Sequence, residues 1–146
     1  GRKNWKDLLN GFLIALGDKE DATLVMKLIT RRKEAVEQVI KYYLEREIPH
    51  RCKVAFVVDY LSDEALLALS QASTYYVQTP RAEGNCLPLM NYLSAGRPGV
   101  SPDHSAMGDY YDDQVGYVVE SNQEPTAWPH DSKLRIRTTW GRLVWT

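Results

Sequence analysis

The loop from Pro80 to Cys86 combines charged, small and nucleophilic residue types directly ahead of a short helical pattern. The glycine at Gly84 lets a ligand approach the backbone closely. A helix that starts after the loop offers free N–H groups and a positive dipole end, which suit a phosphate. The Glu83 carboxylate beside it can accept hydrogen bonds from sugar hydroxyls. This pattern indicates a site for a phosphorylated, hydroxyl-rich ligand; the alternative is that Glu83 only caps the helix and Gly84 only permits a turn.

Two further residues leave alternatives open. Cys86, at the start of the same helix, is either a thiol activated by the helix dipole or a small packing residue. His104 follows a predicted strand and either faces the ligand or lies in a surface turn. The basic residues of the tail either meet an acidic acceptor or another domain of the protein, or form an ordinary solvated face; they are Lys133, Arg135, Arg137 and Arg142.

Strands and helices alternate along the chain, and these elements must position the loop. Short apolar segments predict strands at Ala22–Ile29, Lys53–Val58, Thr74–Thr79, Pro98–Ser101 and Val115–Val119. Helical spacing of apolar residues predicts helices after an Asn4 cap and up to Gly17, from Arg32 to about Arg46, after a Ser62 cap, between Pro88 and Gly96, and over Thr139–Trp145. A turn-rich connection covers Asp103–Asp113.

This alternation predicts an α/β fold, a Rossmann-like three-layer α/β/α domain with a parallel sheet. In such a sheet ligands bind outside the carboxyl ends of the strands. The rule selects the loops after Ile29, Val58, Thr79 and Ser101. The loop after Thr79 is chemically the richest of the four.

Composition narrows the function classes. The 146 residues are 44% hydrophobic and 25% charged, which is typical of a globular chain, and the net charge of -1 argues against nucleic acid as a partner. No apolar run approaches the roughly 20 residues that span a bilayer, and no signal peptide opens the chain. The two cysteines, Cys52 and Cys86, and the three histidines show no metal-ligand spacing, so we expect free thiols and no bound metal. Free thiols fit a reducing compartment, and we therefore expect a cytoplasmic location. The alternative is that a full-length enzyme attaches peripherally to a membrane.

The segment RAEGNCLPLMNYLSAGRPGV, residues 81–100, resembles the signature of group 1 retaining glycosyltransferases, which have two facing Rossmann-like domains. That motif reads roughly Glu-Gly-Phe-Gly-Leu-Pro, then Glu-Ala after two residues, and ends on Gly-x-Pro. The opening RKNWKDLLNGF is similar to the first helix of the family's donor domain. KVAFVVDYLSDEALLALSQAS is similar to the next strand, base-binding turn and helix. The likeness covers Arg2 to about Val119.

The resemblance implies a role for each matching position. Lys3 would neutralise the donor diphosphate, and an arginine that the family has a few residues upstream is missing. Glu83 would contact hydroxyls of the transferred sugar as the catalytic residue. Asn91 stands where the family has a ribose-binding glutamate, a change that costs about 1 kcal/mol of hydrogen-bond strength. The other donor-binding positions are Tyr60 and Leu61 for the base, and the backbone of Gly84, Asn85, Cys86 and Leu87 for the sugar and phosphate.

The resemblance also implies an activity and an organisation. Residues 1–146 would form the donor-binding domain, with 121–146 as a tail and C-terminal helix segment, and a separate N-terminal domain would bind the acceptor. The enzyme would transfer a sugar from a UDP-, GDP- or ADP-sugar with retention of configuration and without a cofactor. Alone, the chain would bind donor weakly, transfer nothing, and self-associate through Trp140, Leu143 and Val144. A non-catalytic nucleotide-sugar-binding module and a nucleotide-sugar epimerase of similar fold are the alternatives.

Overall fold

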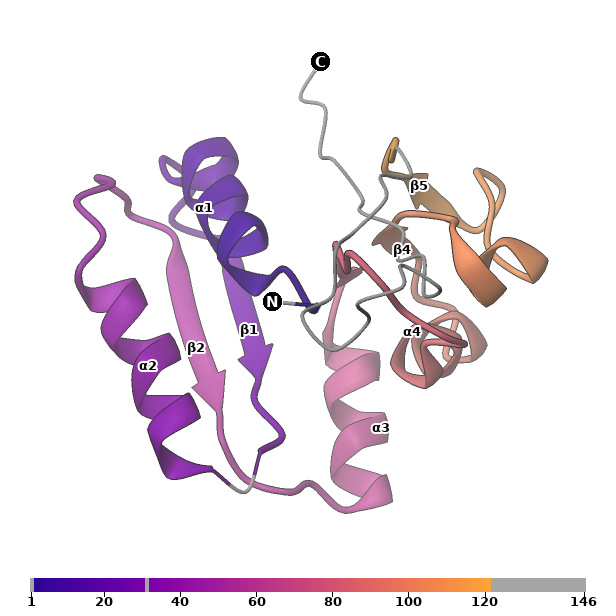
Figure 1. The fold of residues 1–146 in the computed structure, drawn as a ribbon, viewed down its shortest axis with the longest axis horizontal. Helices are drawn as coiled ribbons and strands as arrows, with labels where there is room; N and C mark the ends of the chain where they lie inside the picture. The colour runs from indigo at the N-terminus through magenta and orange to yellow at the C-terminus, as the bar shows by residue number, and fades with distance from the viewer. Residues whose placement is uncertain (1, 31, 122–146) are drawn as a thin grey trace, which may run out of the picture. The chain divides into compact units, whose positions relative to one another are not determined.

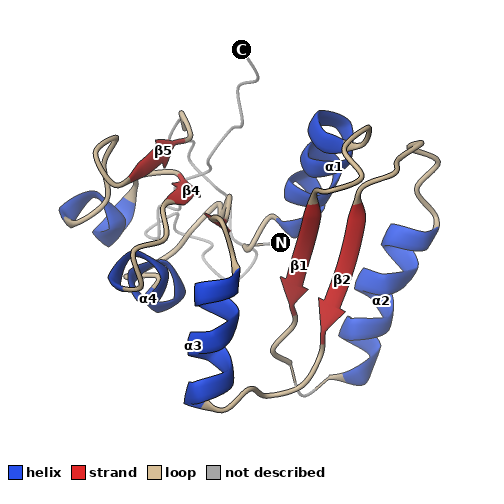
Figure 2. Ribbon diagram, turned by 180° about the vertical axis from the view of Figure 1, so that it is seen from behind, coloured by secondary structure: helices blue, strands red, loops and turns tan. Residues whose placement is uncertain are grey.

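The computed structural model describes residues 2–30 and 32–121, and it has the predicted α/β architecture with parallel strands and flanking helices (Figures 1 and 2). The elements in chain order are α1 (Trp5–Leu16), β1 (Thr23–Lys27), α2 (Lys33–Leu44), β2 (Lys53–Val57), α3 (Asp63–Ala72), β3 (Tyr76–Val77), α4 (Leu87–Ser94), β4 (Gly99–Ser101), a 3-10 turn η1 (Ser105–Asp109) and β5 (Gly116–Val118). The Rossmann-like fold class predicted from the sequence is confirmed. These elements form two compact units, which are described separately.

One unit, Lys6–Ser62, is built on the parallel pair β1 and β2. Thr23 lies opposite Lys53, and the register continues to the pair Lys27 and Val57. Leu24 and Met26 point to the buried face of β1, while Val25 between them is exposed. The helices α1 and α2 lie on the same side of this pair in both views (Figures 1 and 2). The unit therefore has a βαβ crossover with one helix-covered face.

Side chains join the layers of this unit. Asn10 of α1 donates from Nδ2 to the Tyr42 hydroxyl of α2 at 3.0 Å. The ring of Tyr43 packs edge-on against Phe56 of β2, with 5.6 Å between the ring centroids. The Tyr43 hydroxyl also lies 3.0 Å from Nε2 of His50. These contacts fix α2 on the strands, since each joins a different neighbouring element to it.

The other unit contains the described residues up to Trp5 and those from Asp63 onward. Its sheet is parallel in the order β3-β4-β5, with α4 connecting β3 to β4. The core of this unit is a cluster of Cys86, Leu89, Met107 and Tyr111, all at most 5% exposed. Leu89 is on α4 and Met107 is in η1, so the helix and the turn after β4 are anchored by the same cluster.

The strand pairing differs from the single continuous sheet that the sequence pattern suggests. Among the described residues, the ladders divide into the β1-β2 pair and the three-stranded group. The strands of the second group are shorter than predicted, and prolines lie beside two of them, β3 and β4. Pro98 and Pro102 flank β4, and Pro80 closes the segment after β3; a proline has no N–H to give to a ladder.

Two glycines allow the close approach of β4 and β5. A Cβ atom at Gly116 would lie 2.5 Å from the Gly99 carbonyl oxygen and 2.5 Å from the Tyr111 hydroxyl. A Cβ atom at Gly99 would lie 2.6 Å from a methyl group of Leu89. The Tyr111 hydroxyl donates to the Tyr117 carbonyl at 2.8 Å and so links η1 to β5. Only residues without side chains fit at these two positions.

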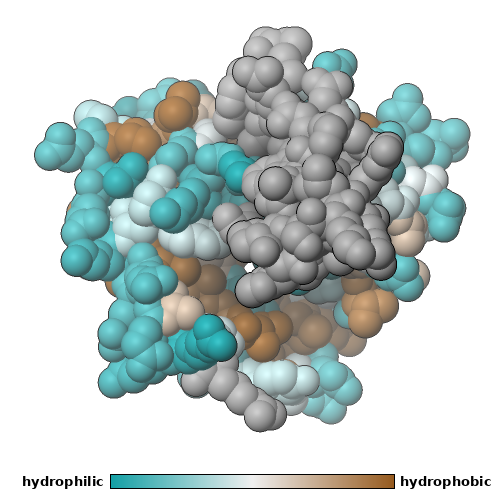
Figure 3. Space-filling view, in the orientation of Figure 1, coloured by the Kyte–Doolittle hydropathy of each residue, from teal (hydrophilic) through white to brown (hydrophobic). Residues whose placement is uncertain are grey.

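The surface in Figure 3 is mainly hydrophilic, with apolar groups between the polar ones. Large apolar side chains that are more than half exposed include Ile14, Ile29, Leu44, Tyr60 and Leu87. In the part of the chain that the structure describes, no helix is long and apolar enough to cross a membrane. The predicted helix over Thr139–Trp145, the tail from 122 onward and the self-association assigned to it lie outside the described residues.

Candidate functional site

The helix α4 starts and ends as its sequence predicts. Cys86 is its N-cap residue, in the left-handed region at φ 49, and Pro88 occupies the first turn, where a missing N–H costs nothing. At the other end Gly96 has φ 70. The N–H of Gly96 donates to Leu93 and that of Arg97 to Tyr92, both at 2.9 Å, which is the Schellman pattern of helix termination. The positive dipole end of α4 therefore faces the Pro80–Cys86 loop.

Glu83 is the centre of the polar contacts in this loop. Its Oε1 atom accepts hydrogen bonds from Arg2 at 3.0 Å and from the Gly84 N–H at 3.2 Å. Its Oε2 atom accepts one from Nζ of Lys3. The Glu83 side chain is 12% exposed, whereas those of Arg2 and Lys3 are over half exposed. Glu83 is therefore a carboxylate shared by two cations, and the alternative that it only caps α4 is wrong, because α4 starts at Leu87 without a side-chain cap bond in the described chain.

The electrostatics of Glu83 follow from these partners. Burial opposes its ionisation, but the hydrogen bond and charge of Lys3 outweigh burial, assisted by the Gly84 N–H and the charge of Arg2. The pKa of Glu83 is consequently lower than its usual value. At neutral pH the side chain is a carboxylate, which accepts hydrogen bonds and donates none.

Backbone pairing brings the N-terminal segment to this loop. The Arg81 N–H donates to the Arg2 carbonyl at 2.8 Å, and Nε of Arg81 donates to Oδ1 of Asn4 at 3.1 Å. Asn4 is 6% exposed and has φ 50, so it turns the chain sharply before α1. Arg2 also donates to the Ala82 carbonyl at 3.2 Å. The structure thus places Lys3 at the predicted site and adds Arg2, which the sequence reasoning did not assign.

A buried polar network lies behind the loop. Gln78 accepts a hydrogen bond from the Cys86 thiol at 2.8 Å. With its Nε2 group Gln78 donates to Oγ of Ser101 at 3.0 Å and to the sulfur of Met107 at 3.1 Å. All four side chains are at most 8% exposed. The sequence pattern did not single out Gln78 and Ser101, although Gln78 directly follows β3 and Ser101 ends β4 at the carboxyl edge, which is the signal that singled out the neighbouring loops.

The thiol of Cys86 is buried and paired with Gln78, which favours the packing interpretation over a reactive thiol. Cys52 is likewise a free, buried thiol, as expected. The Tyr110 hydroxyl donates to the Asn85 carbonyl and so holds the loop from the other side. Burial, together with the nearby Cys86 and Glu83, raises the pKa of Tyr110 to about 12. The tyrosine is therefore a neutral donor at any physiological pH.

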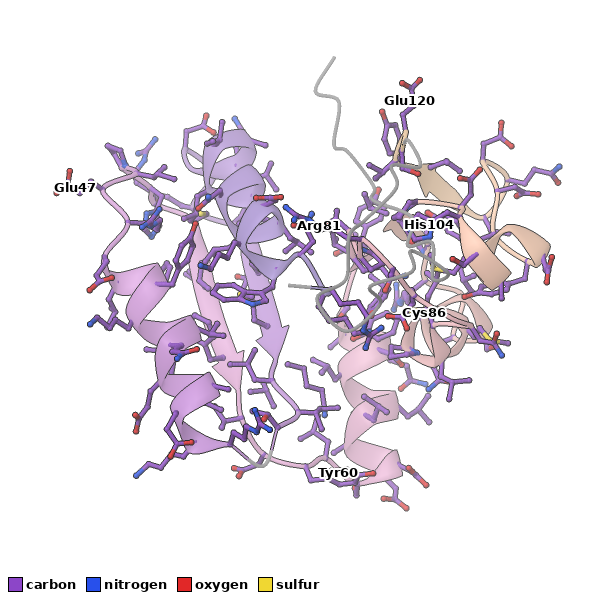
Figure 4. The ribbon with its side chains drawn as sticks, viewed as in Figure 1. Glu47, Tyr60, Arg81, Cys86, His104 and Glu120 are labelled. Atoms are coloured by element: carbon purple, nitrogen blue, oxygen red, sulfur yellow. The ribbon has the colours of Figure 1, made fainter. Side chains whose placement is uncertain are left out.

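His104 has a different place from either predicted alternative. It is 8% exposed, and its Nε2 atom lies 3.0 Å from the Pro80 carbonyl oxygen. Its Nδ1 atom lies 3.3 Å from Oγ of Ser105. Because a carbonyl can only accept, Nε2 carries the proton in this contact. His104 therefore lies neither in a surface turn nor free toward a ligand, and its contact with Pro80 joins the β4–η1 connection to the start of the loop (Figure 4 labels His104).

The remaining predicted positions divide between the two units. Gly84, Asn85, Leu87 and Asn91 are exposed in the loop and first turns of α4, in the same unit as Lys3 and Glu83. Tyr60 and Leu61 belong to the Lys6–Ser62 unit, in the segment that leaves β2. Tyr60 is 88% exposed, and Nζ of Lys27 lies 5.8 Å from its ring centroid (Figure 4 labels Tyr60). An exposed aromatic face suits stacking with a planar base.

One buried hydroxyl at the site lacks a partner. Thr79, the residue before the loop, is 7% exposed, and its Oγ1 atom has no hydrogen-bond partner among the described residues. Over residues 2–30 and 32–121 no cluster of three or more histidine, cysteine or acidic residues could hold a metal ion.

Comparison with solved structures shows a likeness in fold. No protein-family model matches the chain, and no curated protein matches its sequence. A solved structure, the crystal structure of the GtfA/B complex, has a similar fold at a TM-score of 0.58 with 18% sequence identity. The match covers 84% of this chain and 24% of that one, and GtfA/B is a glycosyltransferase complex.

The chain has a glycosyltransferase-like fold. At 18% identity the likeness concerns the fold alone, and this chain spans about a quarter of the solved one. A glycosyltransferase-like fold accounts for the position of the candidate site, because such α/β domains place ligand-binding loops at the carboxyl ends of parallel strands. The loop around Glu83 lies at that edge.

Proposed function

We propose that this chain is the donor-binding domain of a retaining glycosyltransferase and binds a nucleotide-sugar. The observation that carries the proposal is the convergence of Lys3, Arg2 and Glu83 at the N-terminus of α4. The glycosyltransferase-like fold and the signature resemblance of residues 81–100 support the same conclusion. A diphosphate needs cations and N–H donors, a sugar needs a hydrogen-bond acceptor, and this loop offers all three.

The mechanism follows from the charges of these groups. As the glycosidic bond to the donor phosphate breaks, negative charge builds on the leaving diphosphate. Lys3, Arg2 and the N-terminus of α4 stabilise that charge, as preorganised dipoles and cations do in other phosphate sites. Such stabilisation acts more strongly on the transition state than on the bound donor, because the charge develops during the reaction.

Glu83 has a complementary role. Its lowered pKa keeps it ionised, so it acts as an acceptor for hydroxyls of the transferred sugar rather than as a proton donor. When a diphosphate takes the cations, the carboxylate loses two charged partners and becomes available to the sugar. Binding of the two halves of the donor is thereby coupled through Lys3 and Arg2.

The acceptor and any further catalytic group are assigned to another domain of the same enzyme. By itself the chain then binds donor without transferring sugar. A second candidate is a non-catalytic nucleotide-sugar-binding module. The observation that favours it is the amide of Asn91 at a position where the family signature has a carboxylate.

Nuclear magnetic resonance with added UDP, GDP and ADP tests the proposal. The expected result is a set of chemical-shift changes at Lys3 and the Glu83–Leu87 loop with at least one of the three nucleotides. Changes confined to the amino-terminal ends of the strands would contradict the proposal. Sugar transfer to water or acceptor by the isolated chain would contradict the assignment of the acceptor site to another domain.

A further inference from the structure

Cys86 adopts a conformation that its residue type disfavours. Its φ of 49 lies in the left-handed region, which residues with a Cβ atom rarely occupy. The residue is the N-cap of α4 and its carbonyl accepts the N–H groups of Leu89 at 2.9 Å and Met90 at 3.3 Å. The direction of the first turn of α4 therefore depends on how the backbone of Cys86 is held.

The side chain of Cys86 has a specific anchor. Its thiol donates to Oε1 of Gln78, and the amide nitrogen of Gln78 is itself fixed by Ser101 and Met107. These partners come from the end of β3, from β4 and from η1, so the anchor is connected to the rigid part of the unit. Buried networks in which every member is paired define a single conformation more strongly than apolar packing does.

The anchor lies between two groups that meet the donor. The backbone at Cys86 connects the loop that carries Glu83 to the amides that open α4. On the loop side, the Tyr110 hydroxyl donates to the Asn85 carbonyl, and the Cys86 thiol donates to Gln78. These two hydrogen bonds fix the backbone at residues 85 and 86. A shift of the backbone at residues 85 and 86 would move the Glu83 carboxylate and the N-terminus of α4 apart. A misplacement of about 1 Å is enough to slow a group-transfer reaction substantially.

We propose that Cys86 is a positioning residue, whose thiol bond to Gln78 holds the start of α4 in the orientation that receives the donor phosphate. The inference rests on the proposed function for its ligand, and on the described contacts for its geometry. Cys86 contacts no reacting atom in this proposal and acts through the backbone of α4.

Two substitutions at Cys86 distinguish the effect of the thiol hydrogen bond from that of the positive φ. Cys86→Gly accepts a positive φ without a side chain, whereas Cys86→Ser keeps a donor for Gln78. The test is calorimetry of the 146-residue chain with UDP, GDP and ADP. The Cys86→Gly variant should bind the best of these nucleotides about fivefold more weakly than the parent does, because one positioning hydrogen bond is lost. Cys86→Ser should stay within about twofold of the parent. A Cys86→Gly variant that binds as well as the parent would overturn the proposal, since only the backbone angle would then matter.

A partner variant and a ligand-free measurement complete the test. Gln78→Met, which removes the acceptor at similar size, should reproduce the Cys86→Gly defect, and the double variant should add little more. Amide hydrogen exchange at Leu89 and Met90 should quicken in Cys86→Gly and Gln78→Met but not in Cys86→Ser. If the parent binds none of the three nucleotides, the proposed function fails, and the exchange rates alone decide the inference; equal rates in Cys86→Gly and Cys86→Ser would overturn it.

Discussion

Lys3 donates a hydrogen bond to Glu83, a residue 80 positions later in the chain, and Arg2 donates to the other oxygen of the same carboxylate. The carboxylate thus occupies the two cations that a phosphate group would use. In the proposed function, Glu83 would be both an acceptor for sugar hydroxyls and an internal competitor of the diphosphate. Loss of the carboxylate should therefore strengthen binding of the diphosphate and weaken recognition of the sugar, two effects of opposite sign.

Glu83→Gln is expected to tighten binding of a bare nucleoside diphosphate, by up to about fivefold, because removing the carboxylate charge frees Arg2 and Lys3 for the ligand, worth up to about 1 kcal/mol. Binding of the matching nucleotide-sugar should weaken relative to the diphosphate, since the amide is a poorer acceptor. Calorimetry with both ligands measures the ratio. Glu20→Gln, which removes the exposed pair with Arg51 in the other unit, is the control. An unchanged ratio in Glu83→Gln would count against a role for the carboxylate in sugar recognition.

Lys3→Gln should weaken binding of a nucleoside diphosphate by about tenfold, because a charge-assisted contact contributes about 1.4 kcal/mol or more. The loss should shrink with added salt, as for any exposed cation. Lys19→Gln removes a comparable exposed ion pair with Asp18 and should leave binding unchanged. Equal binding by Lys3→Gln and the parent at low salt would place the diphosphate elsewhere.

Asn91→Glu tests the departure from the family signature. If a ribose contacts this position on α4, a carboxylate should tighten nucleotide binding several-fold, by about 1 kcal/mol. Calorimetry with the best of UDP, GDP and ADP gives the number. Binding that stays the same or weakens would mean that the local geometry suits the amide, or that no ribose contacts this turn of the helix.

The pH dependence of Glu83 follows from its lowered pKa. The ion pairs contribute stability above the ordinary glutamate pKa of 4.5, and this contribution is lost as pH falls through the lower pKa of the folded state. Carbon NMR of the side-chain carboxyls should show Glu83 titrating below the ordinary glutamate value. Lys3→Gln should move that titration upward, because Lys3 is the main group that lowers the pKa. A Glu83 midpoint that does not respond to Lys3→Gln would disprove the pairing in solution.

Gly116→Ala should destabilise the unit that contains the site, by about 1–3 kcal/mol or more, because the added methyl group meets backbone atoms of Gly99 and the Tyr111 hydroxyl. Urea unfolding measures the change. Gly84→Ala is the matched control, since nothing lies within 4 Å of the Cβ atom it would add. Equal stability of the two variants would show that β4 and β5 separate more easily than their packing implies.

Local sequence signals determined most of the fold. Helical spacing and the order of Pro88 and Gly96 predicted α4, and apolar segments predicted the five strands in the right places. The observed strands are shorter than the apolar segments predicted, with prolines beside β3 and β4. The division into two ladders depends on which strands meet across the chain, and that is decided by packing between distant residues rather than by any local pattern.

The site divides in the same way. Glu83 and Gly84 could be predicted because a glycine loop before a helix has a recognisable composition. Arg2 and Gln78 could not, because each acts through a contact with a residue far along the chain, Arg2 with Glu83 and Gln78 with Cys86 and Ser101. The positive φ of Cys86 fits the second glycine of the family signature, so that position did carry a conformational signal.

The hydrogen bond between the Arg81 N–H and the Arg2 carbonyl has a practical consequence for how the protein is handled. It fixes the path of the backbone at residue 2 beside Ala82 and Glu83. Any polypeptide joined ahead of residue 2, whether a purification tag or a natural preceding domain, must begin next to the carboxylate. A tag placed there would crowd the mouth of the site and add its own charges to it. Binding measurements should therefore use chains whose leader has been removed, or whose fusion partner is attached at the other end.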